Sequence, residues 1–296
     1  MWEAVALPFR STTNLSLPTT EQIRACTNVL SERYSLKVVQ YSKDIVVKFG
    51  GALDPAEGQT LIYLERHASE VPAPRLYAMY YEDDELFLVM QRAAGSPLDK
   101  LWPSLSELEK QTIVAKLKTI AATMRKVECP WPNFYGGVDG GALRHHLFFS
   151  LAGDMEFLGP FDGEAALVTG LTNNYRALMQ RNDRSDLKVR FYEQNLATVL
   201  RGHRAVLTHG DFQKMNIMVE PKAGNSPDEV TRDFAITLID WEDAGWYPEF
   251  WEFFTASSMF DIASWEDDWC QYAQEIMPVM LGELAVMRML DKDMGI

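Results

Sequence analysis

The feature that most constrains the fold of this chain is a pair of polar motifs, each of which follows a short apolar run. The first motif is His209-Gly210-Asp211, with Asn216 five positions after the aspartate. The second is Asp240, which follows the run from Ala235 to Ile239. An aspartate in a loop after a strand can accept a hydroxyl proton, while an asparagine and a second aspartate offer the oxygen ligands that Mg²⁺ prefers. Phosphoryl transfer needs a positioned hydroxyl, held phosphates and neutralised charge, so this spacing points to that chemistry.

The first ninety residues alternate between strand and helix patterns. Thr19 and Gln22 have the spacing of a capping box, and apolar residues up to Leu30 recur at helical intervals, which favours a helix there. Further strands and one helix are predicted from β-branched runs, prolines and turn residues: strands 36–40, 45–49, 75–81 and 85–90, and a helix over 55–68.

Helical patterns dominate the chain after Met90. Gly95 and Pro97 mark a hinge over residues 91–97, and Ser106 with Glu109 forms a second capping box. Residues 129–163 are rich in glycine, proline and aromatic residues and are expected to be irregular. The remaining elements are predicted as helices over 106–126, 164–181 and 186–201, strands over 205–208, 217–219 and 235–239, and a mostly helical tail from 249.

Charge and cysteine content exclude several classes of protein. The chain carries 28 Lys and Arg against 42 Asp and Glu, a net charge of −14, and has no basic run, so a nucleic-acid partner is not expected. No segment is apolar enough to span a membrane, and the start of the chain does not resemble a signal peptide. Three widely spaced cysteines form no disulfide framework, which favours a reducing, cytoplasmic location.

The two polar motifs, read as HGDxxxxN and IDWE, resemble those of the aminoglycoside phosphotransferase family, which shares the protein-kinase fold. The segments THGDFQ and GWYPEFWEF resemble the fungal branch of that family. The resemblance covers roughly residues 18–260 and continues upstream and downstream in register, through Val46–Phe49, Glu57–Leu61, Val71–Pro74, Phe87–Gln91 and Gly245–Glu252.

The resemblance implies an α+β fold with two lobes. Residues 1–17 would be an N-terminal extension, in which Trp2 or Phe9 could dock. A small nucleotide-binding lobe with an antiparallel sheet would occupy residues 18–90, and 91–97 would be the hinge. The larger, mainly helical lobe over 98–296 would carry catalysis and acceptor binding.

The resemblance also assigns roles to the residues of the two motifs. Asp211 would orient or deprotonate the acceptor hydroxyl, and His209 would brace the loop by hydrogen bonding. Asn216 and Asp240 would hold Mg²⁺ on the phosphates of ATP. Without the surrounding motif, Asp211 and Asn216 could equally be an Asx-turn pair that satisfies loop backbone.

Nucleotide binding is implied for a second group of residues. Lys48 would pair with the α- and β-phosphates, and Glu57 would hold Lys48 in place. Glu65 lies two helical turns after Glu57, near the same face, and is an alternative partner for the lysine. The adenine would be received by the backbone of Met90, Gln91 and Arg92.

Three departures from the protein-kinase pattern bear on the substrate and the cofactors. The segment Tyr34–Lys37 contains no glycine where protein kinases keep a phosphate-covering loop. Trp241 replaces the phenylalanine of DFG, and no APE segment is visible, which argues against a protein substrate. His145 and His146 are not expected to bind zinc, because adjacent helical residues point apart and no further ligand has suitable spacing.

These features predict an ATP- and Mg²⁺-dependent kinase of a small-molecule alcohol, with a catalytically silent nucleotide-binding or scaffolding protein as the alternative. The acceptor could be cationic, like an aminoglycoside or choline, or a homoserine-type metabolite. The acidic cluster of the tail could contact such a cation or could be a solvated helix face. Its members are Asp261, Glu266, Asp267 and Asp268. The oligomeric state is left open.

Overall fold

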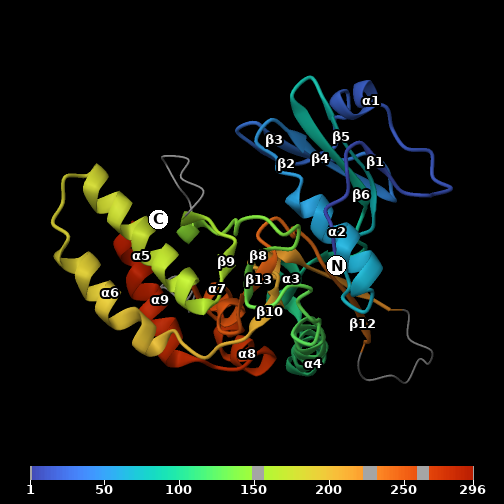
Figure 1. The fold of residues 1–296 in the computed structure, drawn as a ribbon. Helices are drawn as coiled ribbons and strands as arrows, with labels where there is room; N and C mark the ends of the chain where they lie inside the picture. Colours follow the sequence, from blue (N-terminus) through green and yellow to red (C-terminus); the bar gives the residue numbers. More distant parts are fainter. Residues whose placement is uncertain (1, 149–156, 223–231, 259–266, 296) are drawn as a thin grey trace. The chain divides into compact units, whose positions relative to one another are not determined.

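The computed structural model describes residues 2–148, 157–222, 232–258 and 267–295. The chain forms two compact units (Figure 1). The sheet unit contains residues 2–101 and 214–242, and the helical unit contains residues 102–213 and 243–296. Among the described residues, no helix combines the length and the hydropathy that crossing a bilayer requires.

The sheet unit is built on a six-stranded sheet in the order β1-β5-β6-β4-β3-β2, in which every described pair is antiparallel. A second sheet has the order β12-β11-β7. The elements of the unit are β1 (Phe9–Arg10), α1 (Thr20–Arg24), β2 (Val29–Arg33), β3 (Leu36–Gln40), β4 (Ile45–Gly50), α2 (Ala56–His67), β5 (Leu76–Glu82), β6 (Glu85–Gln91), β7 (Ser96–Pro97), α3 (Leu98–Leu101), the 3₁₀ turn η4 (Lys214–Asn216), β11 (Ile217–Pro221) and β12 (Phe234–Leu238).

The central strands of the large sheet agree with the β-branched runs of the sequence. Val47 and Val89 are buried in one apolar cluster, where the Phe87 ring stacks on Phe49 at 5.1 Å between centroids. A tight turn joins β5 to β6, in which Asp83 and Asp84 have φ values of 51° and 61°. Two left-handed residues match the twist of a tight hairpin, and aspartate tolerates that conformation.

The helix expected up to Leu30 is wrong beyond its first turns. The Thr19 capping box is present, but α1 ends at Arg24 and Val29 begins strand β2. Val29 and Leu30 are 38% and 54% exposed, so their helical spacing does not reflect a buried helix face. Antiparallel pairing of β2 with β3 outweighs the weak helical periodicity of this segment.

The helical unit combines helices with a four-stranded sheet in the order β10-β13-β8-β9. One apolar cluster of this unit includes Leu171, Tyr192, Trp251 and Leu290. The elements are η1 (Trp102–Ser104), α4 (Glu107–Met124), β8 (Phe134–Gly137), η2 (His146–Phe148), β9 (Phe161–Asp162), α5 (Glu164–Arg181), α6 (Leu187–Val199), β10 (Ala205–Thr208), β13 (Gly245–Pro248), α7 (Trp251–Ser258), α8 (Trp269–Ile276) and α9 (Leu281–Met294).

The sequence predicted the long helices of this unit and strand β10, and missed the other three strands of its sheet. The Ser106 capping box starts α4, as expected. The segment 129–163, expected to be irregular, contributes β8 and β9, and Gly245–Pro248 forms β13 between β10 and β8. These strands are only two to four residues long, so they carry no periodic signal. The lobe and hinge boundaries at 18–90, 91–97 and 98–296 stay a prediction.

Candidate active site

Lys48 is the centre of a buried ionic cluster in the sheet unit. Its side chain is 7% exposed, and its ammonium lies 2.8 Å from Glu57 Oε2. Asp240 Oδ1 and Glu242 Oε2 are each 2.7 Å from the same nitrogen. The ammonium donates hydrogen bonds to Asp240 and Glu242 and forms an ion pair with the buried carboxylate of Glu57.

Three different elements deliver these groups, each for a local reason. Lys48 lies in β4 between Val38 of β3 and Leu88 of β6, which fixes its backbone on both sides. Glu57 is in the first turn of α2. Asp240 follows β12 with a φ of 64°, a left-handed conformation that aspartate adopts more readily than most residues. The bend of the chain at Asp240 thus turns its carboxylate toward Lys48.

Burial and charge act in opposite directions on this cluster. Burial by itself would lower the pKa of Lys48, but Glu57, Asp240 and Glu242 outweigh it and raise the pKa above its ordinary value. Burial raises the pKa of the Glu57 carboxyl, an effect that Lys48 opposes. The lysine is therefore a permanent cation at neutral pH, which is the state needed to bind a phosphate.

Asn216 lies beside Asp240 in the same unit. Ile217 of β11 pairs with Leu238 of β12, and one step further Ile239 donates its N–H to the Asn216 carbonyl at 2.9 Å. The sequence placed Asn216 and Asp240 at the ends of paired strands, and the structure brings them together there. Carboxylate oxygens of Glu57, Asp240 and Glu242 also lie within 4.8 Å of one another. This set of hard oxygen donors fits Mg²⁺.

The His209–Asp211 loop belongs to the helical unit and follows β10. Its backbone is held by Glu252 of α7, whose carboxylate accepts the N–H of His209 at 2.7 Å and that of Gly210 at 3.2 Å. His209 Nδ1 accepts the N–H of Asp211 at 3.3 Å, so the histidine does brace the loop. Asp211 itself is partly exposed.

The chemistry of this loop depends on two features of the sequence. Gly210 has a φ of +86°, and a Cβ there would lie 2.5 Å from the Asp243 carbonyl oxygen, so only glycine fits. Glu252 is 6% exposed, and burial raises its pKa to about 7, although the two backbone N–H groups oppose this shift. The carboxyl that orders the loop therefore titrates near neutrality.

The segment expected to receive adenine has part of its backbone already engaged. The N–H of Gln91 donates to the Arg75 carbonyl at 2.8 Å, and that of Arg92 donates to Asp44 at 2.9 Å. Met90 lies within β6, paired with Val46 and Leu76 of the neighbouring strands. An adenine base at this segment would therefore have to bind backbone groups other than these two N–H groups, which are already hydrogen-bonded.

The geometry distinguishes between the two glutamates that the sequence left open as partners of Lys48. Glu57 contacts the lysine, whereas Glu65 lies 2.8 Å from the Nε of Arg75. Sequence reasoning missed Glu242 and Glu252. Both were visible as the final residue of a quoted motif, IDWE and GWYPEFWE, but nothing in the spacing alone showed what they would bind.

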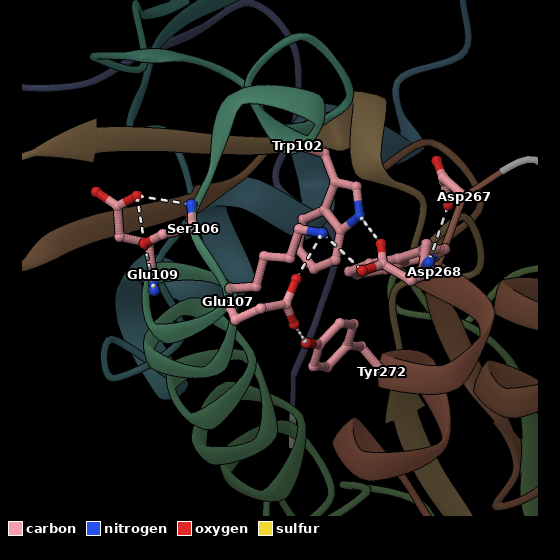
Figure 2. A network of polar contacts seen from close by, with 9 residues as sticks. Trp102, Ser106, Glu107, Glu109, Asp267, Asp268 and Tyr272 are labelled. Atoms are coloured by element: carbon pink, nitrogen blue, oxygen red, sulfur yellow. Dashed lines mark hydrogen bonds and ion pairs between the residues drawn. The ribbon is translucent and has the colours of Figure 1, made fainter.

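The acidic cluster of the tail is only partly described, since Asp261 and Glu266 lie outside the described residues. Asp267 Oδ1 accepts the N–H of Trp269 at 2.9 Å, near the start of α8. Asp268 accepts the Trp102 indole N–H at 2.7 Å and lies 2.6 Å from Lys110 Nζ (Figure 2). Both described acids thus have partners inside the helical unit.

The same network continues through α4. Glu107 accepts a hydrogen bond from the Tyr272 hydroxyl at 2.7 Å (Figure 2). Lys110 Nζ lies 5.2 Å from the centroid of the Trp102 ring. These contacts join the start of α4 to α8. The described part of the acidic cluster is therefore a packing contact between helices, while its role toward an acceptor stays a prediction.

The two adjacent histidines do not point apart, as a helical position would require. Their ring centroids are 4.1 Å apart, because η2 begins only at His146. His146 Nε2 lies 2.8 Å from Asp291. His145 is buried, and burial lowers its pKa well below the ordinary value.

The fold of the chain is that of solved aminoglycoside phosphotransferases. A streptomycin–ATP ternary complex of APH(2″)-IIa is 14% identical over 93% of this chain and 83% of that chain, with a TM-score of 0.54. ADP-bound APH(2″)-Ib is 14% identical over 90% and 79%, with a TM-score of 0.56. An aminoglycoside-3′-phosphotransferase of type VIII is 17% identical over 92% and 98%, with a TM-score of 0.54.

The fold of the chain is α+β with a protein-kinase-like architecture. Residues 53–280 match the phosphotransferase enzyme family, and the chain belongs to that family. It is thus an enzyme that transfers a phosphoryl group to a hydroxyl group of a small molecule. Curated protein sequences contain no match to the chain.

Proposed function

We propose that this enzyme uses ATP and Mg²⁺ to phosphorylate a hydroxyl group of a small molecule. The observation that carries the proposal is the cluster in which carboxylate oxygens of Glu57 and Asp240 lie within 2.8 Å of Lys48 Nζ. Asn216 lies beside Asp240, because its carbonyl accepts the N–H of Ile239. A cation held by carboxylates at the end of a strand pair is suited to phosphates that arrive with a divalent metal. The solved APH(2″)-IIa complex contains ATP, which supports a nucleotide in this fold.

Each residue has one role in the proposed reaction. Lys48, held by Glu57, binds phosphate oxygens, and Met90, Gln91 and Arg92 form the segment next to the adenine. Asp211 accepts the hydroxyl proton as that oxygen attacks the γ-phosphorus, and ADP leaves.

The metal ligands of the proposal are Asn216 and Asp240, whose oxygens suit Mg²⁺. When bound, Mg²⁺ supplies positive charge that neutralises the phosphates during transfer. Glu242 Oε2 lies 2.7 Å from Lys48 Nζ, and its side chain is the most exposed of the three carboxylates. Nucleotide phosphates must displace one carboxylate to reach the ammonium, and Glu242, which is 53% exposed, is the one that can turn into solvent.

We propose that residues 18–90 form the nucleotide-binding lobe, 91–97 the hinge and 98–296 the lobe for catalysis and acceptor binding. We also propose that the enzyme is cytoplasmic and has neither nucleic acid nor membrane as a partner. A cationic acceptor is the class to test first. Streptomycin, kanamycin and hygromycin B are present in solved structures of this fold. The net charge of −14 is compatible with a cationic substrate.

The experiment is a coupled ADP-release screen over aminoglycosides, amino alcohols and sugars, followed by mass spectrometry of the product. We expect a mass increase of one phosphate on one class. Asp211→Asn should lower turnover by about 10²–10⁴ while Mg-ATP binding, measured by calorimetry, stays intact. Wild-type turnover in Asp211→Asn would exclude the proposed base, and Mg-ATP binding that survives Lys48→Ala unchanged would exclude the proposed phosphate site.

A further inference from the structure

The segment before α1 is not a loose extension, because it is attached to the helix that carries Glu57. We define the N-terminal strap as residues 2–12. Within it, the Val5 N–H donates to Gln59 Oε1 at 2.8 Å, and Gln59 Nε2 donates to the Val5 carbonyl at 2.8 Å. Gln59 is 4% exposed and uses its amide as a backbone peptide would in a sheet. Figure 1 shows the N-terminus beside α2.

Aromatic contacts extend this attachment along α2. The Trp2 ring is 7% exposed and meets Tyr63 and His67 edge-on, both at 5.4 Å between centroids. Arg66 lies 5.9 Å from the centroid of the same ring. Gln59, Tyr63 and His67 are four residues apart and therefore share one face of the helix, which the strap covers.

The other end of the strap is fixed to the large sheet. Phe9 and Arg10 form β1, which pairs with Met79 and Ala78 of β5. Ser11 then donates its N–H to the Tyr77 carbonyl at 2.8 Å. The strap thus joins α2 to the sheet that carries Lys48, through contacts that are independent of Lys48 itself.

This connection matters because burial of the Glu57 carboxylate carries a cost in solvation free energy. Its side chain is 3% exposed, and removing a carboxylate from water is unfavourable unless the partner stays in place. Loss of the precise position of α2 would let Glu57 turn toward solvent and leave Lys48 with only its exposed partners. Packing must therefore fix the first turn of α2.

Three consecutive residues fix that turn in three directions. Glu57 contacts Lys48, Gly58 faces the sheet and Gln59 contacts the strap. A Cβ on Gly58 would lie 2.4 Å from Met79 Sδ and 3.1 Å from Leu88 Cδ2, so α2 packs closely on these side chains of the sheet. Successive residues are about 100° apart around a helix, so these contacts oppose rotation in either direction.

We propose that the N-terminal strap is a positioning element for the active site, and that Gln59 and Trp2 are positioning residues that hold Glu57 against Lys48. The inference rests on the proposed function, since it gives the Lys48–Glu57 pair a role in nucleotide binding. Neither Gln59 nor Trp2 touches the reacting atoms. Their contribution reaches the nucleotide only through α2.

The test compares Gln59→Ala with Thr20→Val in the full chain, by calorimetric titration with ATP in excess MgCl₂. Thr20 is a matched control, because it is also buried in the sheet unit and makes two side-chain hydrogen bonds, to Tyr80 at 3.1 Å and Glu82 at 2.8 Å. We expect Gln59→Ala to weaken Mg-ATP binding about tenfold, as loss of a supporting contact does elsewhere. Thr20→Val should change it by less than about twofold.

Variants of the strap keep the test valid if Gln59→Ala folds poorly. Val5→Pro removes one of the two hydrogen bonds without a change in α2 and should weaken binding in the same direction. Trp2→Ala should weaken binding, and Trp2→Phe should restore it, because a phenylalanine ring can still meet Tyr63 and His67. Equal weakening by Thr20→Val and Gln59→Ala would overturn the inference.

A double-mutant cycle separates this inference from the proposed function. In a Glu57→Gln background, Gln59→Ala should cause no further loss of Mg-ATP affinity if the strap acts through Glu57. Full additivity would overturn the inference. If Glu57→Gln alone leaves Mg-ATP binding unchanged, the proposed role of the Lys48–Glu57 pair in nucleotide binding fails as well. If Glu57→Gln weakens binding but Gln59→Ala does not, only the positioning role of the strap is rejected.

Discussion

Glu57 in the sheet unit and Glu252 in the helical unit are both buried, at 3% and 6% exposure, yet they are compensated differently. Glu57 faces the ammonium of Lys48, a full charge on another element. Glu252 accepts the backbone N–H groups of His209 and Gly210, and the more distant charge of Arg125 adds a smaller stabilising effect. The first arrangement can be broken by a change in the partner side chain. The second depends mainly on backbone donors, and because burial disfavours its ionised form, it is weakened as the pH rises.

The largest effect is expected from removing the charge that Glu57 depends on. Lys48→Met should abolish phosphoryl transfer and lower the free energy of unfolding by about 3–5 kcal/mol, because it leaves buried Glu57 uncompensated. Chemical denaturation measures the change. Lys37→Met is the control on the neighbouring strand, since Lys37 lies 3.7 Å from an exposed Glu32 and should matter by less than about 1 kcal/mol. Similar losses in the two variants would contradict the comparison.

The arrangement at Glu252 is tested by the pH dependence of the free energy of unfolding. Its pKa is raised to about 7 in the folded protein, from 4.5 as the ordinary value, so between these pH values the folded state binds a proton that the unfolded chain has lost. The free energy of unfolding should therefore fall as pH rises through this window, by about 3 kcal/mol at most. Glu252→Gln should remove this decline and reduce turnover, because a glutamine oxygen cannot accept both N–H groups in the same way.

Denaturation of both proteins at about pH 5 and about pH 8 checks the sign of this effect. The difference in unfolding free energy between the two pH values should be smaller in Glu252→Gln than in the wild type. An equal decline in both proteins would show that other groups cause it.

A smaller effect is expected at the exposed side of the Lys48 cluster. Glu242 has the same 2.7 Å contact with Lys48 that Asp240 has, but its side chain is 53% exposed. Water screens such a pair, so Glu242→Gln should change the free energy of unfolding by less than about 1 kcal/mol. Glu57→Gln, at 3% exposure, should cost more. If the two variants cost the same, burial is not what distinguishes them.

The comparison also explains what the sequence could predict. Asp211, Asn216, Lys48 and Glu57 could be singled out because motif spacing and strand order are local properties of the sequence, and their roles stay predictions. The contact of Glu242 with Lys48 depends on a turn at Asp240, and that of Glu252 on the packing of α7, and both are set by tertiary structure. Val29 and Leu30 misled the helix prediction because apolar spacing does not reveal whether a side chain is buried.

The attachment of the N-terminal strap could not be read from residues 2–12 either. This segment has no periodicity, and its anchor, Gln59, is a polar residue within a predicted helix. Backbone-to-side-chain hydrogen bonds between distant segments leave no pattern in either one. Such contacts are the part of a site that a sequence alone does not specify.

The smallest effect concerns the network between α4 and α8. Burial opposes ionisation of Asp268, but hydrogen bonds from Lys110 and Trp102 lower its pKa overall. A cycle of Lys110→Met and Asp268→Asn should give a coupling energy of about 0.5–1 kcal/mol at neutral pH. The exposed pair Asp186–Arg190 at the start of α6 is the control, and its coupling should be about 0.3–0.5 kcal/mol.

The coupling of Asp268 to Lys110 should also disappear as the pH falls through the lowered pKa of Asp268, because a protonated carboxyl no longer pairs with the ammonium. Denaturation of the cycle at neutral and acidic pH measures this loss. Asp268 already binds a cation and an indole N–H, so Asp268→Asn should leave the KM for any acceptor found in the screen unchanged. A raised KM for a cationic acceptor would instead place this aspartate in the acceptor site and make the acidic tail part of the enzyme's specificity.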